Sequence, residues 1–453
     1  MTKTKILTFV QKYTMIIALV LVTSFFAWRT HGKILMPQNI TNIIAQNAYV
    51  FVLATGMLCC ILTGGNIDLS VGSVVCFVGT IGAVLMHKNL NMWLAVLVML
   101  AVGLMIGAWQ AFWIAYVKVP PFITTLSGML VFRGLSNVVL QGKTMAVTNE
   151  AFIRIFGGGA NCYVPDFLSF LKVEGIKNML CLVVGIIACL VYLFFAFRNA
   201  LVRKKAGLET SPLYAVAIKA VVIVAVGMFF TIRLAQYKGL PTALIWVVTV
   251  IAIYSYITSK TTIGRHLYAV GGNEVATKLS GINTKSVYFF AYANMGMLAG
   301  LAGILTIARL TSAQPTYGQN YEMDAIGSCF IGGASAYGGV GTVPGVIIGA
   351  LLMGVINIGM SIMGVDANYQ KVVKGLVLLA AVIFDVVSKK KNSCRIQQTA
   401  VNCRLFFYFG YEGGSGGTRQ EERFDRVFQG GQSRGAARRD RGISGLSRRI
   451  ADL

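Results

Sequence analysis

A short polar stretch separates two strongly apolar runs near the beginning of the chain. Residues 64–73 read Gly-Gly-Asn-Ile-Asp-Leu-Ser-Val-Gly-Ser, so the Asp68 carboxylate stands beside apolar segments, where it is costly unless it is capped, paired or hydrated. Two adjacent glycines permit a helix to break, and the helix ends at such breaks bind polar solutes in membrane proteins. We therefore expect Asn66, Asp68 and Ser70 at a helix break or on a translocation pathway. The alternative for Asp68 is structural, as a cap on the next helix.

The sequence offers no arrangement typical of an enzyme or of a metal centre. The cysteines are scattered, mostly within apolar runs, and the histidines His31, His87 and His266 are far apart, so neither a disulfide framework nor a metal site is indicated. Gly142-Lys143-Thr144 resembles the end of a phosphate-binding loop, but Asn137 stands where that loop requires its first glycine. We therefore expect no catalytic residues, no metal and no cofactor on this chain, and any ATP would be used by a partner subunit.

The composition indicates which solvent surrounds most of the chain. Hydrophobic residues make up 56% of it and charged residues only 12%, whereas about a quarter of the residues of a soluble domain are charged. In a bilayer the backbone N–H and C=O groups find hydrogen-bond partners only within helices or closed barrels. The apolar runs lack the alternation of apolar and polar residues that is typical of strands. We predict an all-α, polytopic integral membrane protein with about 10–12 transmembrane helices, including broken or re-entrant segments. The expected spans are residues 13–28, 43–62, 67–86, 93–117, 121–140, 178–197, 212–232, 241–258, 286–308, 323–338, 345–363 and 369–387.

Basic residues gather in the loops, and their distribution predicts the orientation. Cytoplasmic loops carry an excess of Lys and Arg, and a cytoplasmic N-terminus places the basic clusters at 198–205, 260–285 and 389–391 inside. The net charge of +24 is therefore expected to face the cytoplasm and the lipid headgroups rather than nucleic acid.

We expect two regions, a transmembrane domain at 1–391 and a basic, Gly/Arg-rich tail at 392–453. The tail contains eleven Arg and no Lys, and such a composition does not bury a core. A disordered tail that binds anionic lipid or nucleic acid is one interpretation. We favour the other, a non-native end, because the expected transmembrane architecture is complete at Val387.

Two further stretches each allow a functional and a structural interpretation. Within residues 273–283 an acidic residue stands near the start and a glycine follows the helix-favouring residues, which predicts a short helix on the cytoplasmic face. This helix is either a rigid contact surface for a partner or only a solvated connection. Tyr317 and Tyr321 are flanked by Gln and Asn residues. One interpretation is that they line an outer vestibule for a sugar, and the other is that they anchor the chain at the membrane–water interface. The glycine-dense segment 332–345 predicts a break, and glycines spaced by four after it predict close helix packing.

Three of these stretches together resemble one transporter family. Residues 64–73, the loop 264–285 that begins Gly-Arg-His-Leu-Tyr-Ala-Val-Gly-Gly-Asn, and the glycine-rich segment 327–354 are similar to the permease subunits of ATP-binding-cassette importers for monosaccharides, of the ribose, xylose and galactose type. The likeness covers residues 10–390 and does not include the tail.

The resemblance implies a permease of the bacterial inner membrane that moves a neutral monosaccharide into the cytoplasm, with the outer loop 141–177 favouring the xylose or multiple-sugar type. It implies a second permease copy, an extracytoplasmic sugar-binding protein, and a cytoplasmic ATPase docked on Glu274, Ala276 and Gly281. Movement of that loop would reach the broken helix at residues 66–70. The alternative is a secondary transporter of a small polar solute driven by an ion gradient, for which Asp68 is the expected buried ionisable group, with Glu322 and Asp324 near an edge.

Overall fold

The computed structural model describes residues 3–158, 162–168, 175–205, 207, 213–383 and 386. These residues belong to one compact unit, Met1–Val386. The predicted tail at 392–453 and the basic cluster at 389–391 lie outside the described residues.

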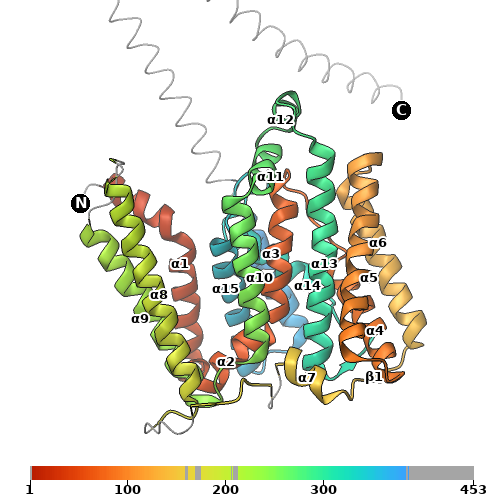
Figure 1. Cartoon of the computed structure of the whole chain (residues 1–453), viewed down its shortest axis with the longest axis horizontal. Helices are drawn as coiled ribbons and strands as arrows, with labels where there is room; N and C mark the ends of the chain where they lie inside the picture. Colours follow the sequence, from red (N-terminus) through yellow and green to blue (C-terminus); the bar gives the residue numbers. More distant parts are fainter. Residues whose placement is uncertain are drawn as a thin grey trace, which may run out of the picture. The chain divides into compact units, whose positions relative to one another are not determined.

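Helices form nearly all of the regular structure, which confirms the all-α prediction (Figure 1). In the first part of the chain they are α1 (Lys3–Arg29), the 3-10 turn η1 (Lys33–Leu35), α2 (Pro37–Gln46), α3 (Ala48–Leu62), α4 (Val71–His87), α5 (Met92–Phe112), the π-helical turn η2 (Trp113–Val117), α6 (Pro121–Leu140) and α7 (Glu150–Phe156). The later helices are α8 (Met179–Lys205), α9 (Leu213–Tyr237), α10 (Thr242–Lys260), α11 (Thr262–Gly272), α12 (Glu274–Leu279), α13 (Thr284–Leu310), α14 (Tyr321–Ile331) and α15 (Val343–Ile362). Residues 367–383 are also helical. The two-residue strands β1 (Met145–Ala146) and β2 (Ser312–Ala313) pair antiparallel, with Met145 opposite Ala313.

Among the described residues, seven helices are long and apolar enough to cross a membrane, and the bent pair α2–α3, with 43° between its halves, counts as an eighth. Shorter apolar helices cover Met15–Arg29 and Val71–His87. Five of the twelve expected spans are not among these seven helices. The expected span 13–28 is one of the shorter apolar helices, and that at 369–387 is described continuously only over the helical residues 367–383. The other three are broken or short. The expected span 43–62 is divided between α2 and α3, and that at 67–86 begins only at Val71. The expected span 323–338 is helical only as far as Ile331, so a short helix and a glycine-rich turn replace it.

The span α13 lies at the centre of the helices, between α3 and α5 (Figure 1). Its apolar stretch is 83% buried, whereas the apolar stretches of α8 and α9 are 6% buried. Gly296 and Gly300 of α13 lie against Gly103 and Gly107 of α5, so the two backbones approach closely. In the same way Gly349 of α15 lies against α14. These contacts agree with the packing expected from the glycine spacing.

Candidate functional site

The polar stretch between α3 and α4 forms a non-helical segment, residues 63–70, that holds Asn66, Asp68 and Ser70. Asp68 and Ser70 are buried, with 2% and 0% of their surface exposed. The Asp68 Oδ1 atom accepts hydrogen bonds from the Ser70 backbone N–H at 2.8 Å and from the Ser70 hydroxyl at 2.6 Å. Gln110 of α5 donates to the Ser70 Oγ atom at 2.8 Å. Asp68 therefore stabilises the turn that leads into α4 and is joined through Ser70 to α5.

Ser70 is the residue before α4, but its side chain makes no capping hydrogen bond to that helix. The Asp68 carboxylate bonds to Ser70 itself rather than to the free N–H groups of the first helical turn. This is a local turn closed by an aspartate side chain, which differs from the helix cap that the sequence suggested as an alternative.

The three stretches that carry the family resemblance meet at one place. The Gly339 N–H donates to the Leu62 carbonyl at 3.1 Å. A Cβ atom on Gly271 would lie 1.8 Å from that same carbonyl oxygen, and one on Gly338 would lie 2.4 Å from the Gly64 Cα atom. Only glycine permits such close approach of backbones. We call Leu62, Gly64, Gly271, Gly338 and Gly339 the glycine junction.

Tyr268 of α11 adds a side-chain link beside the glycine junction. Its hydroxyl donates to the Gly341 carbonyl at 2.7 Å. Burial raises the pKa of this hydroxyl, with the nearby Cys59 adding to the effect, so the hydroxyl stays protonated and can donate. The loop that contains α11 is thus fixed to the glycine-rich turn after α14.

The two ends of the short helix α12 are set by a capping asparagine and by a glycine. The Asn273 side chain accepts a hydrogen bond from the Ala276 N–H at 3.0 Å and so caps the first turn. After the helix ends, Gly281 adopts a left-handed conformation with φ +84°, which glycine adopts without strain. In Figure 1, α12 lies beyond the end of α13, at the opposite end of the helices from α7 and β1.

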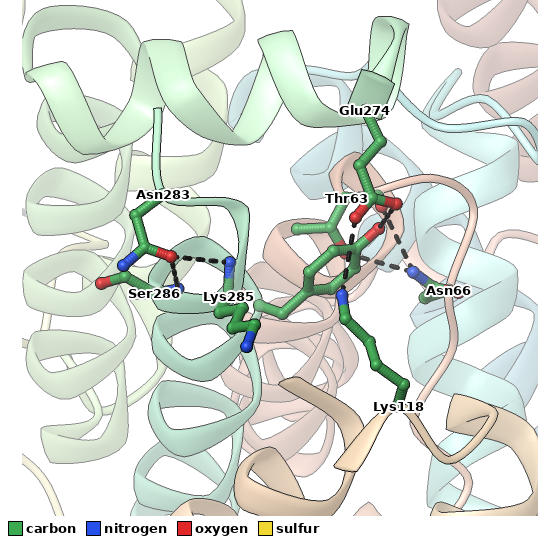
Figure 2. A network of polar contacts seen from close by, with 8 residues as sticks. Thr63, Asn66, Lys118, Glu274, Asn283, Lys285 and Ser286 are labelled. Carbon is green, nitrogen blue, oxygen red and sulfur yellow. Dashed lines mark hydrogen bonds and ion pairs between the residues drawn. The ribbon is translucent and has the colours of Figure 1, made fainter. Parts of the chain in front are cut away.

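Glu274 points from α12 toward the transmembrane helices (Figure 2). Its Oε2 atom accepts a hydrogen bond from the Tyr288 hydroxyl of α13 at 3.1 Å, and its Oε1 atom lies 3.6 Å from the Lys118 Nζ atom. The Lys118 ammonium also lies 5.3 Å from the centre of the Tyr288 ring, a cation–π geometry. Asn66 borders the same Tyr288 hydroxyl and donates to the Thr63 carbonyl at 3.3 Å. The structure therefore joins Glu274 to the non-helical segment that holds Asn66.

The outer face of α12 presents two large apolar side chains. Val275 is 69% exposed and Leu279 is 84% exposed. Residues four apart share one face of a helix, so the two side chains form one apolar patch. Ala276 is exposed as well, and a Cβ atom on Gly281 would meet nothing within 4 Å. The sequence analysis missed Val275 and Leu279, although an apolar pair at this spacing in a polar loop is a recognisable signal.

The two expected vestibule residues have different surroundings. The Tyr321 ring stacks on Tyr49, with centroids 3.6 Å apart, and it lines a cavity of about 40 Å³ together with Arg309. That volume is far below the roughly 300 Å³ at which ligand pockets begin. The Tyr317 hydroxyl instead hydrogen-bonds with the Ser312 Oγ atom at 2.9 Å.

A buried ion pair was not anticipated from the sequence. Lys374, from the helical residues 367–383, lies 2.9 Å from the Asp324 Oδ1 atom, and their side chains are 18% and 2% exposed. The Tyr49 hydroxyl donates to the Asp324 Oδ2 atom at 2.8 Å. Asp324 lies in the first turn of α14, near the end of the expected span 323–338, and it is a buried residue paired with Lys374. Within the described part of the chain, no group of three or more His, Cys, Asp or Glu residues could hold a metal ion.

Residues 39–382 match the family model described as branched-chain amino acid transport system / permease component. The chain is 33% identical over 388 residues to the xylose transport system permease protein XylH of Escherichia coli (strain K12), covering 84% of this chain and 93% of that protein. It is 36% identical over 383 residues to XylH of Haemophilus influenzae, covering 84% and 97%. It is 33% identical over 348 residues to the ribose import permease protein RbsC of E. coli (strain K12), covering 77% and 85%. No solved structure matches the chain.

Proposed function

The chain belongs to the family of permease components of branched-chain amino acid transport systems, and from this premise we propose that it is the permease subunit of an ATP-binding-cassette importer that moves a neutral monosaccharide into the cytoplasm. As a permease component it is a membrane transport protein, not an enzyme, and no cofactor is expected on it. A monosaccharide is favoured because relatives that match 84% and 77% of this chain are named for xylose and ribose. A sugar of the xylose type is favoured further because the xylose relatives match a larger share of the chain.

The observation that carries this proposal is the arrangement of α12, which has an apolar outer face and an acidic residue on its inner side. Large apolar side chains exposed together on a water-facing helix are typical of a protein contact. The ATPase subunit docks on Val275 and Leu279, with Ala276 beside them, and Gly281 supplies the left-handed turn that ends α12 at this surface. Glu274 has the different role of holding α12 against the transmembrane helices.

Two routes lead from α12 to the broken helix. One passes from Glu274 through Tyr288 to Asn66, and the other passes from α11 through the glycine junction to Leu62. Movement of α12 by the ATPase therefore shifts the segment 63–70. This segment holds Asp68 and Ser70, so a change in its position alters the polar groups available to a sugar and supports alternating access.

The orientation and the remaining partners follow from the position of α12. The N-terminal end of α1 lies at the same end of the helices as α12 (Figure 1), so a cytoplasmic α12 implies a cytoplasmic N-terminus, in a multi-pass protein of a bacterial inner membrane. The opposite end, with α7 and β1, faces an extracytoplasmic sugar-binding protein. A second copy of the permease completes the transporter as a homodimer.

The alternative, a secondary transporter driven by an ion gradient, draws support from the buried carboxylate of Asp324. That carboxylate is paired with Lys374 and accepts from Tyr49. A group compensated in this way is better suited to holding helices together than to releasing protons. We therefore retain ATP-driven import as the proposed function.

The substrate class is tested by reconstituting the chain in lipid vesicles with its ATPase and binding-protein partners and supplying ATP. Labelled xylose, ribose, glucose and leucine are offered separately. Leucine is the matched control because the family description refers to branched-chain amino acids. The proposal expects ATP-dependent uptake of at least one monosaccharide and none of leucine. Uptake of leucine alone would contradict it.

A further inference from the structure

A cavity of about 290 Å³ lies between the middle of α6, the start of α14 and the helical segment 367–383. Its polar lining consists of Arg133, Gln319, Asn320, Glu322 and Lys371, with two apolar residues of α6 completing the wall. We propose that this cavity is a binding subsite for one monosaccharide ring on the translocation pathway. This inference rests on the proposed function and names the place where the sugar is held.

The chemistry of the lining fits a neutral polyol. Sugar hydroxyl groups both donate and accept hydrogen bonds, and the cavity supplies both kinds of partner. Arg133 and Lys371 donate, Glu322 accepts, and the amides of Gln319 and Asn320 do both. The volume lies at the lower limit of ligand pockets, roughly 300–1,000 Å³, which suits a single sugar ring rather than an oligosaccharide.

The fold holds the charged residues of the cavity in place. The Arg133 Nη1 atom donates to the Pro315 carbonyl at 3.0 Å and to the Tyr317 carbonyl at 2.6 Å. These bonds fix the turn that carries Gln319. Glu322 is only 8% exposed, and Arg133 supplies the nearby positive charge. A buried carboxylate among apolar helices is costly and is a candidate for a functional group.

The ion pair between Asp324 and Lys374 anchors the remaining wall. Lys371 is three residues before Lys374, so the two side chains lie on the same face of their helix. The 2.9 Å contact of Lys374 with Asp324 therefore holds Lys371 at the cavity. Two acidic residues of the first turn of α14 thus have separate roles, Asp324 in holding the helices and Glu322 in facing the solute.

The position of the cavity suits entry from outside. The residues Gln319 to Glu322 follow β2 closely in the sequence, and β2 pairs with β1 at the end of the helices opposite α12. A larger cavity of about 500 Å³ is lined by His87, Lys143 and neighbouring residues, but its lining contains no carboxylate. It therefore lacks the balance of donors and acceptors found beside Glu322.

The subsite is tested by protection of an introduced thiol in the full chain, reconstituted in vesicles of neutral phosphatidylcholine. Gln319 is exposed and Lys143 lines the other cavity, so Gln319→Cys is the test variant and Lys143→Cys the matched control. D-xylose and D-ribose are the probes, and the rate of modification by a charged thiol reagent is measured. At a sugar concentration of about ten times the Kd, occupancy should slow the modification of Gln319→Cys about tenfold. The Lys143→Cys rate should not change.

A second variant separates this inference from the proposed function. In the complete transporter, Glu322→Gln keeps the shape of the side chain and removes its charge, and it should raise the KM for sugar. If ATP-driven monosaccharide uptake occurs but Gln319→Cys is unprotected and Glu322→Gln has the wild-type KM, the subsite is wrong and the proposed function stands. The labelling is repeated in vesicles that also contain anionic phosphatidylglycerol. If these vesicles protect Gln319→Cys and sugar does not, the cavity binds a lipid headgroup and the inference is overturned. If no monosaccharide is taken up at all, the proposed function itself fails.

Discussion

The Tyr288 hydroxyl donates a hydrogen bond of 3.1 Å to the Glu274 carboxylate, and this contact fixes the inner side of α12 to the central span α13. Lys118 approaches the same carboxylate from the turn between α5 and α6. The helix that presents Val275 and Leu279 outward is therefore held from behind by two separate transmembrane elements. A force applied to the outer face reaches both of them.

The first prediction concerns transmission through Glu274. Tyr288→Phe removes the hydrogen bond to Glu274, of about 1 kcal/mol at this partly exposed position. Glu274→Gln weakens the same bond and also removes the charge that faces Lys118. We expect sugar uptake per ATP hydrolysed to fall about fivefold, with assembly of the transporter unchanged. The double variant should lose little more than Glu274→Gln alone, because the contact removed by Tyr288→Phe is already weakened there. Sugar uptake and ATP hydrolysis are measured for each variant. If the loss of coupled uptake in the double variant equals the sum of the two single losses, the two residues do not act through a shared contact.

The second prediction concerns docking of the ATPase. Val275→Asp and Leu279→Asp place a charge in the proposed interface, and burial of one such apolar side chain contributes about 1.5–3 kcal/mol. We expect the affinity of the ATPase for the permease to fall at least about tenfold, measured by equilibrium binding in detergent. Lys278→Gln is the matched control, because it is exposed on the same helix and keeps the apolar pair. Equal binding by all three variants would exclude α12 as the docking site.

The third prediction asks whether glycine is needed at position 281 because of its small size or because of its left-handed backbone conformation. Its φ of +84° is left-handed, and nothing lies within 4 Å of an added Cβ atom. A β-branched residue there costs about 1–2 kcal/mol in the backbone, while asparagine tolerates the conformation. We expect Gly281→Val to lower coupled uptake and Gly281→Asn to retain most of it, with both inserted in the membrane. Equal loss in both variants, measured as uptake per inserted protein, would indicate a steric contact with the ATPase instead.

The fourth prediction concerns stability. Removing one partner of a buried ion pair costs about 3–5 kcal/mol, and the Asp324 side chain is 2% exposed. Asp324→Asn should therefore lower the thermal unfolding temperature of the purified protein clearly. Adding Lys374→Met should restore part of the loss, because the uncompensated ammonium is then removed as well. If the double variant is less stable than Asp324→Asn alone, loss of the ion pair is not the cause of the lower unfolding temperature.

Local signals in the sequence account for the parts of the site that were predicted. The glycine pair before Asn66 indicates a break, and the acidic start and glycine stop around α12 indicate a short helix. Each of these features depends on residues that are close together in the chain. The glycine spacing at the start of α15 likewise predicts close packing without identifying the partner helix.

The rest of the site depends on contacts between residues far apart in the sequence. Leu62 and Gly339 are joined by one hydrogen bond, and nothing in either segment alone identifies the other. Lys374 lies within an apolar run that predicts a span, and its partner Asp324 belongs to α14, 50 residues earlier in the chain. The inward direction of Glu274 also depends on Tyr288, which the loop sequence does not contain.

The central claim is that a separate ATPase, pushing on α12, drives solute through this chain. The most direct measurement is labelled xylose uptake into vesicles that contain the permease and the binding protein, with the ATPase and ATP present or omitted, and with a proton or sodium gradient imposed or collapsed. The account predicts uptake that requires the ATPase and ATP and that persists when both gradients are collapsed. Uptake by the permease without the ATPase, driven by a gradient alone, would contradict it.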